Sequence, residues 1–173
     1  MKAKQWYKRF CDYYDDDKAI GKLSRTGACD QDGIWTPAMM GLLRRIGEDF
    51  GCEVSEERGV AGGGRSDQRW VKDNASLVYI EHENRCNEKI DGEIHKLCND
   101  VSKLKVLITY LADRRFEEDV ERLNQKIQRL IHECSATFCG ELLLVVSGDR
   151  ERDWEAHISV LRMEPLKSKG GQT

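Results

Sequence analysis

The stretch RSDQRWVKDNASLVYIEHE (residues 65–83) carries the strongest fold signal in the chain. Residues 65–71 and 76–83 read as two β-strands, and the polar KDNA segment at 72–75 is typical of a turn at hairpin length. The stretch therefore predicts an antiparallel hairpin, to which the other predicted elements are added on both sides in the sequence.

Three acidic residues of this hairpin can meet on one patch of sheet. Glu81 and Glu83 lie two residues apart in one strand, so their side chains share a face. Asp67 lies in the other strand, opposite Ile80 or Glu81 depending on the length of the turn. Carboxylates this close repel one another unless a cation neutralises them, and Mg²⁺ or Mn²⁺ prefers oxygen ligands. The hairpin predicts a divalent-cation site at Asp67, Glu81 and Glu83; the alternative is a solvated acidic edge.

Helices and further strands are expected on both sides of the hairpin. The helices are predicted over residues 4–20, 36–51, 88–99 and 116–134, and the other strands over residues 52–58, 104–110, 141–147 and 155–163. A meander followed by β-α-β crossovers favours an α/β fold with a mixed central sheet of about five to six strands, flanked by helices on both faces.

The order of these elements and acids resembles the PD-(D/E)XK (restriction-endonuclease-like) nuclease superfamily. An acidic residue on one strand is followed by a turn and by an apolar run that ends in acidic-x-charged, and the order α-β-β-β-α-β is similar over residues 36–110. The resemblance implies a restriction-endonuclease-like fold. It places Asp67 and Glu81 at the two metal-binding acids of the family and Glu83 at the position that usually holds lysine.

Two positions depart from the family pattern. Glu83 replaces the lysine that helps to position or activate the attacking water, and Ser66 stands where proline usually precedes the first acid. Some restriction enzymes with this fold carry glutamate there and still cleave. Lys96, on the next predicted helix, could supply a catalytic positive charge; otherwise it is a solvated lysine. Glu48 could add an outer carboxylate to the metal site, as first-helix glutamates do in the superfamily; otherwise it is a surface charge.

Basic and aromatic residues lie next to the acids. Arg65, Arg69 and Lys72 could hold phosphates while Trp70 stacks on a base. Trp70 could equally belong to the core. His82 is expected on the face opposite the metal site.

Composition and charge limit the class of protein. The 173 residues fit one nuclease-like domain over 1–166, with its core at 36–110 and a flexible tail at 167–173. The longest apolar run, residues 141–147, is too short to span a bilayer, and the first residues lack a signal-peptide pattern. We therefore expect a cytoplasmic protein without a membrane partner. The formal net charge of −3 argues against coating nucleic acid through bulk charge, but a local basic surface remains compatible with it.

Seven cysteines in a chain without an export signal are expected to be reduced thiols. Two sets of residues could act as zinc ligands: Cys86, His95 and Cys98 in one, and His132, Cys134 and Cys139 in the other. Neither set has the paired spacing that is typical of a zinc site.

These observations leave three functional hypotheses. The first is a metal-dependent nuclease that hydrolyses DNA, with Mg or Mn as its cofactor. The alternative is a cleavage-inactive nuclease-fold module that binds nucleic acid or serves in an assembly. The third is a protein-interaction domain that uses the long helix over 116–134. A homodimer is compatible with the fold, but nothing in the sequence identifies an interface.

Overall fold

The computed structural model describes residues 1–19, 35–58, 66–83, 90–111, 113–134 and 138–148. The side chains of residues 18, 19, 35, 57, 58, 66, 67 and 113 also lie outside the description. The strand expected over 155–163 and the tail at 167–173 fall outside the described residues.

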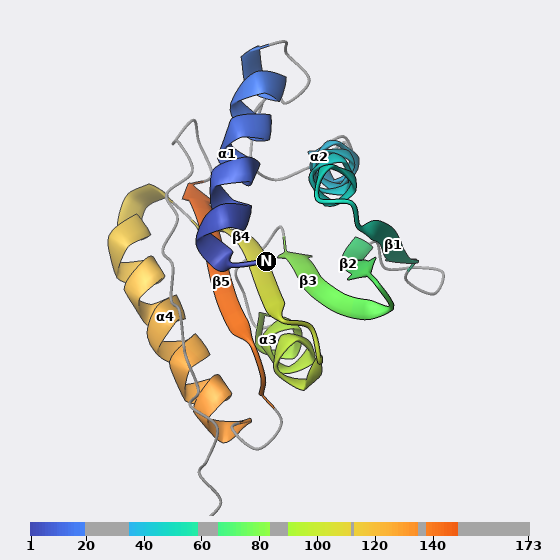
Figure 1. Ribbon diagram of the computed structural model, residues 1–173. Coiled ribbons are helices and arrows are strands. Elements are labelled where there is room, and N and C mark those ends of the chain that lie inside the picture. The colour runs from blue at the N-terminus through green and yellow to red at the C-terminus, as the bar shows by residue number, and fades with distance from the viewer. Residues whose placement is uncertain (20–34, 59–65, 84–89, 112, 135–137, 149–173) are drawn as a thin grey trace, which may run out of the picture.

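The described strands form one mixed sheet in the order β1-β2-β3-β4-β5 (Figure 1). They are β1 (Glu53–Arg58), β2 (Ser66–Lys72), β3 (Ala75–Glu83), β4 (Leu104–Leu111) and β5 (Glu141–Gly148). The first three strands pair antiparallel, whereas β4 lies parallel to both β3 and β5. The α/β fold with a mixed five-stranded sheet is confirmed, as are the antiparallel hairpin and the parallel pairing of β3 with β4.

Helices cover both faces of this sheet. They are α1 (Ala3–Ala19), α2 (Trp35–Asp49), α3 (Ile90–Asn99) and α4 (Phe116–Glu133), and a short 3₁₀ turn, η1 (Asp113–Arg115), precedes α4. Helices α1 and α2 pack on one face, and α3 and α4 pack on the other. None of the described helices combines the length and apolar character that a membrane span requires.

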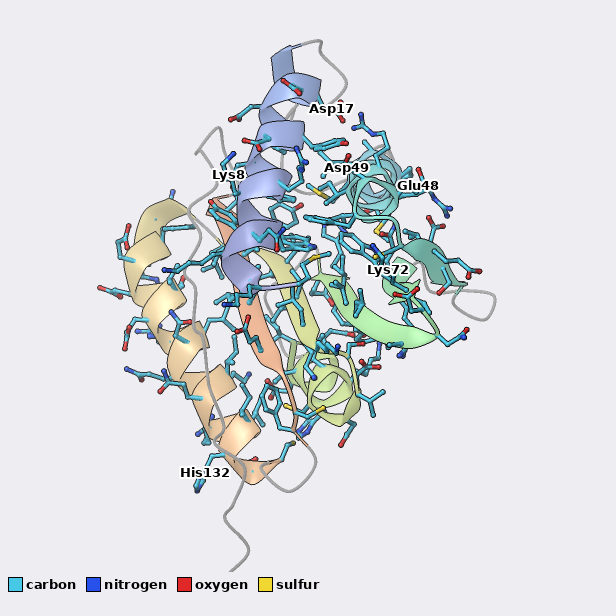
Figure 2. All side chains as sticks on the ribbon, viewed as in Figure 1. Lys8, Asp17, Glu48, Asp49, Lys72 and His132 are labelled. Carbon is cyan, nitrogen blue, oxygen red and sulfur yellow. The ribbon has the colours of Figure 1, made fainter. Side chains whose placement is uncertain are left out.

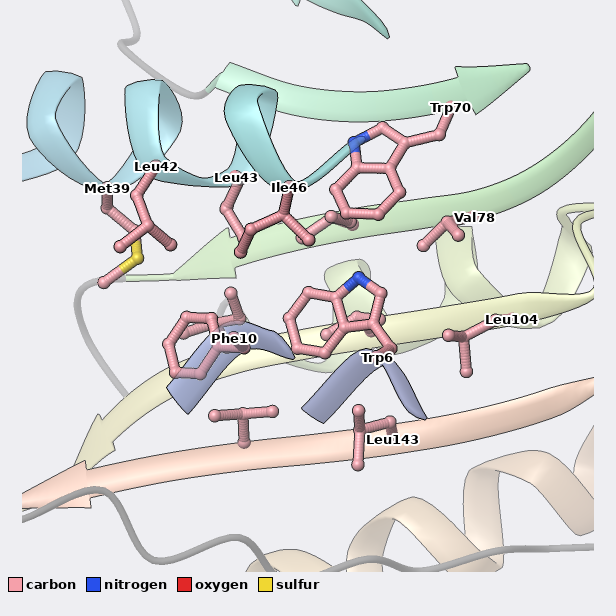
Figure 3. Close-up of a cluster of buried hydrophobic side chains, with 14 of the residues drawn as sticks. Trp6, Phe10, Met39, Leu42, Leu43, Ile46, Trp70, Val78, Leu104 and Leu143 are labelled. Carbon is pink, nitrogen blue, oxygen red and sulfur yellow. The ribbon is translucent and has the colours of Figure 1, made fainter. Parts of the chain in front are cut away.

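The face under α1 and α2 is built around aromatic rings (Figure 3). The rings of Trp6 and Phe10 stack with their centroids 5.4 Å apart, and the ring of Trp70 lies 6.2 Å from that of Trp6. Helix α2 approaches the strands so closely that a Cβ atom at Gly47 would lie 2.5 Å from a Val54 methyl carbon. Glycine at this position lets α2 pack directly on the rings.

The opposite face buries the apolar side of α4. The buried residues of this helix recur at helical spacing against the sheet: Phe116, Val120, Leu123, Ile127, Leu130 and Ile131. The apolar side is therefore covered by the protein's own sheet. The hypothesis of a protein-interaction domain that uses this helix remains a prediction.

The register of the hairpin is set by a tight turn and a bulge. Asp73 and Asn74 have φ of 53° and 60°, which two-residue hairpin turns require. Beside the turn, Lys72 pairs with Ala75, and this register alone would carry Asp67 opposite Ile80. A shift after Trp70 changes it, so that Gln68 pairs with Ile80. Carried one residue further, the shifted register brings the backbone of Asp67 opposite that of Glu81.

Candidate functional site

Two of the predicted acids lie buried at one end of the sheet. Glu81 and Glu83 keep only 1% and 6% of their surface exposed. Both occupy β3 positions that alternate with Ile80 and His82, and they therefore face α3 and α4. Glu83 ends its strand. The pair thus lies toward the carboxyl ends of the parallel strands, where open α/β sheets usually bind their ligands.

Lys96 reaches this pair from α3. Its Nζ atom lies 3.6 Å from Oε1 of Glu81 and donates a hydrogen bond of 2.8 Å to Oε2 of Glu93. The Lys96 side chain is about half exposed (46%), whereas both carboxylates are buried. The helix thus holds a half-exposed lysine against a buried acid of the sheet.

Glu93 is a member of the cluster that sequence reasoning missed. It is 3% exposed, because it lies on the apolar side of α3 with Ile90, Ile94 and Leu97. Helical periodicity places position 93 beside positions 90, 94 and 97. That pattern, together with Lys96 three residues later, is the signal that could have found it.

The structure describes the backbone of Asp67 but not its side chain. The residue belongs to β2 and pairs with Glu57 of β1. The register carries its backbone toward Glu81. A meeting of three carboxylates at Asp67, Glu81 and Glu83 remains a prediction.

The metal site likewise remains a prediction. Within the part of the chain whose side chains are described, no group of three His, Cys, Asp or Glu residues is arranged to hold a metal ion. Thr109 pairs with Glu83 across the parallel strands. Its Oγ1 atom is buried and, among the described residues, has no hydrogen-bond partner. A buried hydroxyl beside two carboxylates adds to a set of hard oxygen donors.

The expectation that Trp70 contacts a nucleic-acid base needs correction. Trp70 is fully buried in the cluster under α1 and α2, and its Nε1 atom donates a hydrogen bond of 3.2 Å to Gln68. Its strand position directs it to the face opposite Glu81. Of the two roles that the sequence leaves open for Trp70, the structure supports the core.

The basic residues predicted around it do not form one cluster beside the acids. Arg69 forms an ion pair of 2.7 Å with Asp100 and lies over the ring of Tyr79. Lys72 lies at the turn end of the hairpin and donates to the backbone carbonyl of Phe50 at 2.9 Å. Arg65 lies outside the described residues. Arg69 and Lys72 therefore have intramolecular partners in this structure.

Glu48 is also separated from the acids. It is exposed on α2, and α2 packs on the face opposite Glu81 and Glu83. Figure 2 shows it at the outer side of α2. The prediction that Glu48 adds a carboxylate to the metal site is wrong for this arrangement, because the sheet separates α2 from that site.

His82 lies where alternation predicts, on the face under α1 and α2. Its Nε2 atom lies within hydrogen-bonding distance, 2.9 Å, of the Tyr110 hydroxyl. Both residues are buried. This contact ties β3 to β4 on the side away from the acids.

A second buried charge, which the sequence analysis did not single out, lies on the same face as the acids. Lys105 is fully buried at the start of β4. Its ammonium donates to the carbonyl of Ser102 at 2.7 Å and to that of Cys139, and it lies 5.0 Å from the centre of the Phe138 ring. Burial lowers its pKa, and the neighbouring thiol of Cys139 and the Asp100 carboxylate oppose that shift. Basic and acidic side chains thus occupy opposite ends of one sheet face.

Comparison with known proteins yields no family. No protein-family model matches the chain, and no curated protein matches its sequence. The nuclease resemblance therefore depends on the order of elements and the placement of a few side chains.

Proposed function

We propose that the chain is a cytoplasmic, metal-dependent nuclease that hydrolyses phosphodiester bonds in DNA. The observation that carries the proposal is the position of Lys96, with its ammonium 3.6 Å from the buried carboxylate of Glu81. Glu83 leaves the superfamily's lysine position without a positive charge. Lys96 supplies one to the same site from the helix that follows.

The order of elements supports the same proposal. Helix α2, strands β1 to β3, helix α3 and strand β4 follow one another in the order that the superfamily core implies. The pair Glu81 and Glu83 lies on the third strand of this series, and Asp67 lies on the second. These are the positions that the resemblance assigns to the acids.

The donor set fits a hard divalent cation such as Mg²⁺ or Mn²⁺. Glu81 and Glu83 offer carboxylate oxygens from one strand face, and the Thr109 hydroxyl lies across from Glu83. Asp67 would provide the third carboxylate. When bound there, the cation would help to stabilise negative charge on the scissile phosphate and favour ionisation of the attacking water.

Lys96 has a role of its own in this proposal. Glu93 accepts a hydrogen bond of 2.8 Å from the Lys96 ammonium, which restricts the position of that group. The Lys96 side chain is still about half exposed to solvent. A phosphate that approaches Glu81 from solvent would meet this ammonium first. Lys96 would attract the phosphate, orient it and compensate charge that develops during hydrolysis.

Cleavage assays with matched variants test the proposal. Purified protein is incubated with supercoiled plasmid and with single-stranded DNA in Mn²⁺ or Mg²⁺, with chelator as the blank. We expect metal-dependent cleavage that falls by about 10²-fold or more in Glu81→Ala and in Lys96→Met, since each removes a preorganised charge. Lys103→Met is the control, because Lys103 is an exposed lysine directly before β4, and this variant should cleave as the wild type does.

One observation favours the alternative of a cleavage-inactive module that binds nucleic acid or serves in an assembly. Lys96 already lies against two buried carboxylates, Glu81 and Glu93, so the cluster is partly neutralised without a cation. Wild-type protein that binds DNA but cleaves neither substrate with either metal would support this alternative and contradict the nuclease.

A further inference from the structure

Two thiols and an imidazole meet where α3 packs beside the end of α4. His95 and Cys98 lie three residues apart on α3, and Cys134 directly follows α4. The Sγ atom of Cys134 lies 3.6 Å from Nδ1 of His95. Cys134 also packs against the buried apolar cluster that includes Cys98, so the two thiols are neighbours. Neither cysteine is in a disulfide.

The two thiols differ in exposure. Cys98 is fully buried in the apolar cluster between the sheet and these helices. Cys134 is only partly buried and packs against the edge of that cluster. Burial raises the pKa of Cys98 to about 12, and the neighbouring Cys134 adds to the shift. Cys98 is therefore a protonated thiol near neutral pH, and solvent reaches Cys134 first.

The trio does not amount to a metal centre. It combines members of both sets that the sequence suggests as zinc ligands, yet no three His, Cys, Asp or Glu side chains within the described ranges are placed to hold a metal ion. Two adjacent thiols with an imidazole beside the more exposed one are instead suited to two-electron oxidation.

We propose that Cys134 and Cys98 form a site that hydrogen peroxide or a related hydroperoxide oxidises to a disulfide. Cys134 is the reacting thiol, His95 accepts its proton, and Cys98 completes the disulfide. The proposal is independent of the nuclease activity.

The chemistry balances in two steps. With its proton on Nδ1 of His95, Cys134 attacks one peroxide oxygen; the O–O bond breaks, a sulfenic acid forms, and the other oxygen takes the proton and leaves as water. The sulfur of Cys98 then attacks the sulfenic sulfur; the S–O bond breaks, and the departing oxygen takes the Cys98 proton to form a second water. Two thiols are oxidised by two electrons in total, and one hydrogen peroxide is reduced to two waters.

Peptide mapping of the full chain tests the proposal directly. Reduced protein is treated with hydrogen peroxide, quenched with a thiol-alkylating reagent, digested without reductant and followed by mass spectrometry over time. We expect a linked pair of peptides that contain Cys98 and Cys134 to form before any other cysteine is oxidised. Linkage of Cys134 to Cys139, or similar oxidation rates at all seven cysteines, would overturn the proposal.

Variants separate the three roles. In Cys98→Ala the sulfenic acid at Cys134 should persist and be trapped by dimedone, because no thiol resolves it. His95→Ala should slow disulfide formation roughly tenfold or more, at the lower end of what a positioned proton acceptor contributes. His132→Ala is the control, since His132 is exposed in the last turn of α4 (Figure 2) and should react like the wild type. A wild-type rate in His95→Ala would contradict the role of His95.

Discussion

The two faces of the sheet are made by the same strands but bury different chemistry. Under α1 and α2, apolar and aromatic side chains dominate, and the polar strand residues Gln68 and His82 are hydrogen-bonded within that face. Under α3 and α4, apolar packing is interrupted by charged groups: Glu81, Glu83, Glu93 and Lys105.

Charge burial is costly unless it is compensated. The face under α1 and α2 is therefore stabilised mainly by apolar packing, whereas the opposite face also buries charged groups, among them Glu81 and Glu93 beside Lys96. Buried ionisable groups are enriched at functional sites. This comparison favours the α3 and α4 side as the place of the proposed site, and each face can be tested separately.

The largest effect on stability is expected on the aromatic face. Replacing Trp70 with alanine should lower the free energy of unfolding by about 3–5 kcal/mol, the range for removal of a buried large aromatic side chain. Urea unfolding followed by circular dichroism measures this change. Trp70→Phe keeps a ring but loses the hydrogen bond to Gln68, so its loss should be much smaller. A Trp70→Ala variant as stable as the wild type would contradict the buried position.

A smaller effect is expected on the charged face, and it should depend on metal. Manganese at a hundred times its dissociation constant should stabilise the wild type by about 2.7 kcal/mol, and Glu81→Ala should abolish this gain. Without metal, Lys96 still has Glu93 as a partner in that variant, so the fold should be retained. Thermal unfolding with and without Mn²⁺ measures the difference.

Glu48→Ala is the matched control for this experiment. Glu48 is an exposed acid on the other face, so the variant should keep the full gain. Equal stabilisation of wild type and Glu81→Ala would show that manganese binds elsewhere.

The smallest effect on the free energy of unfolding should appear only at alkaline pH. The pKa of Cys98 is raised by burial from 9.0 to about 12, so the folded state retains a proton that the unfolded state loses. The stability contributed by this group is fully present below pH 9 and is lost as the pH rises from 9 toward 12. Between pH 9 and 10, the free energy of unfolding of the wild type should fall by roughly 1 kcal/mol relative to that of Cys98→Ala. Parallel pH profiles from urea unfolding would contradict this expectation.

Most of the fold could be predicted because its signals are local. The apolar run within 76–83 and the turn at 72–75 predict the hairpin, and helical spacing over 116–134 predicts α4 within a residue at its C-terminal end. The register was left open because it depends on the bulge after Trp70. No local pattern in the sequence marks the position of that bulge.

The candidate site could be predicted only in part for the same reason. Alternation places Glu81 and Glu83 on one face, and that placement is confirmed. Which helix covers that face is a tertiary property, and it decides that Lys96 reaches Glu81 whereas Glu48 does not. Lys105 shows the same limit: nothing in LKVLITYL (104–111) marks its lysine as buried, because its partners Ser102 and Cys139 lie outside the strand.

The order of the strands has a consequence for how the chain is made. Because the sheet runs β1-β2-β3-β4-β5 in chain order, each strand that leaves the ribosome can add to the edge formed by the strand before it. Helix α1 is an exception to this order of addition. The backbone N–H of Ala3 donates a hydrogen bond of 3.0 Å to Glu141, at the start of the last described strand. Helix α1 therefore cannot complete this contact until β5 has emerged, although α1 precedes all five described strands in the chain.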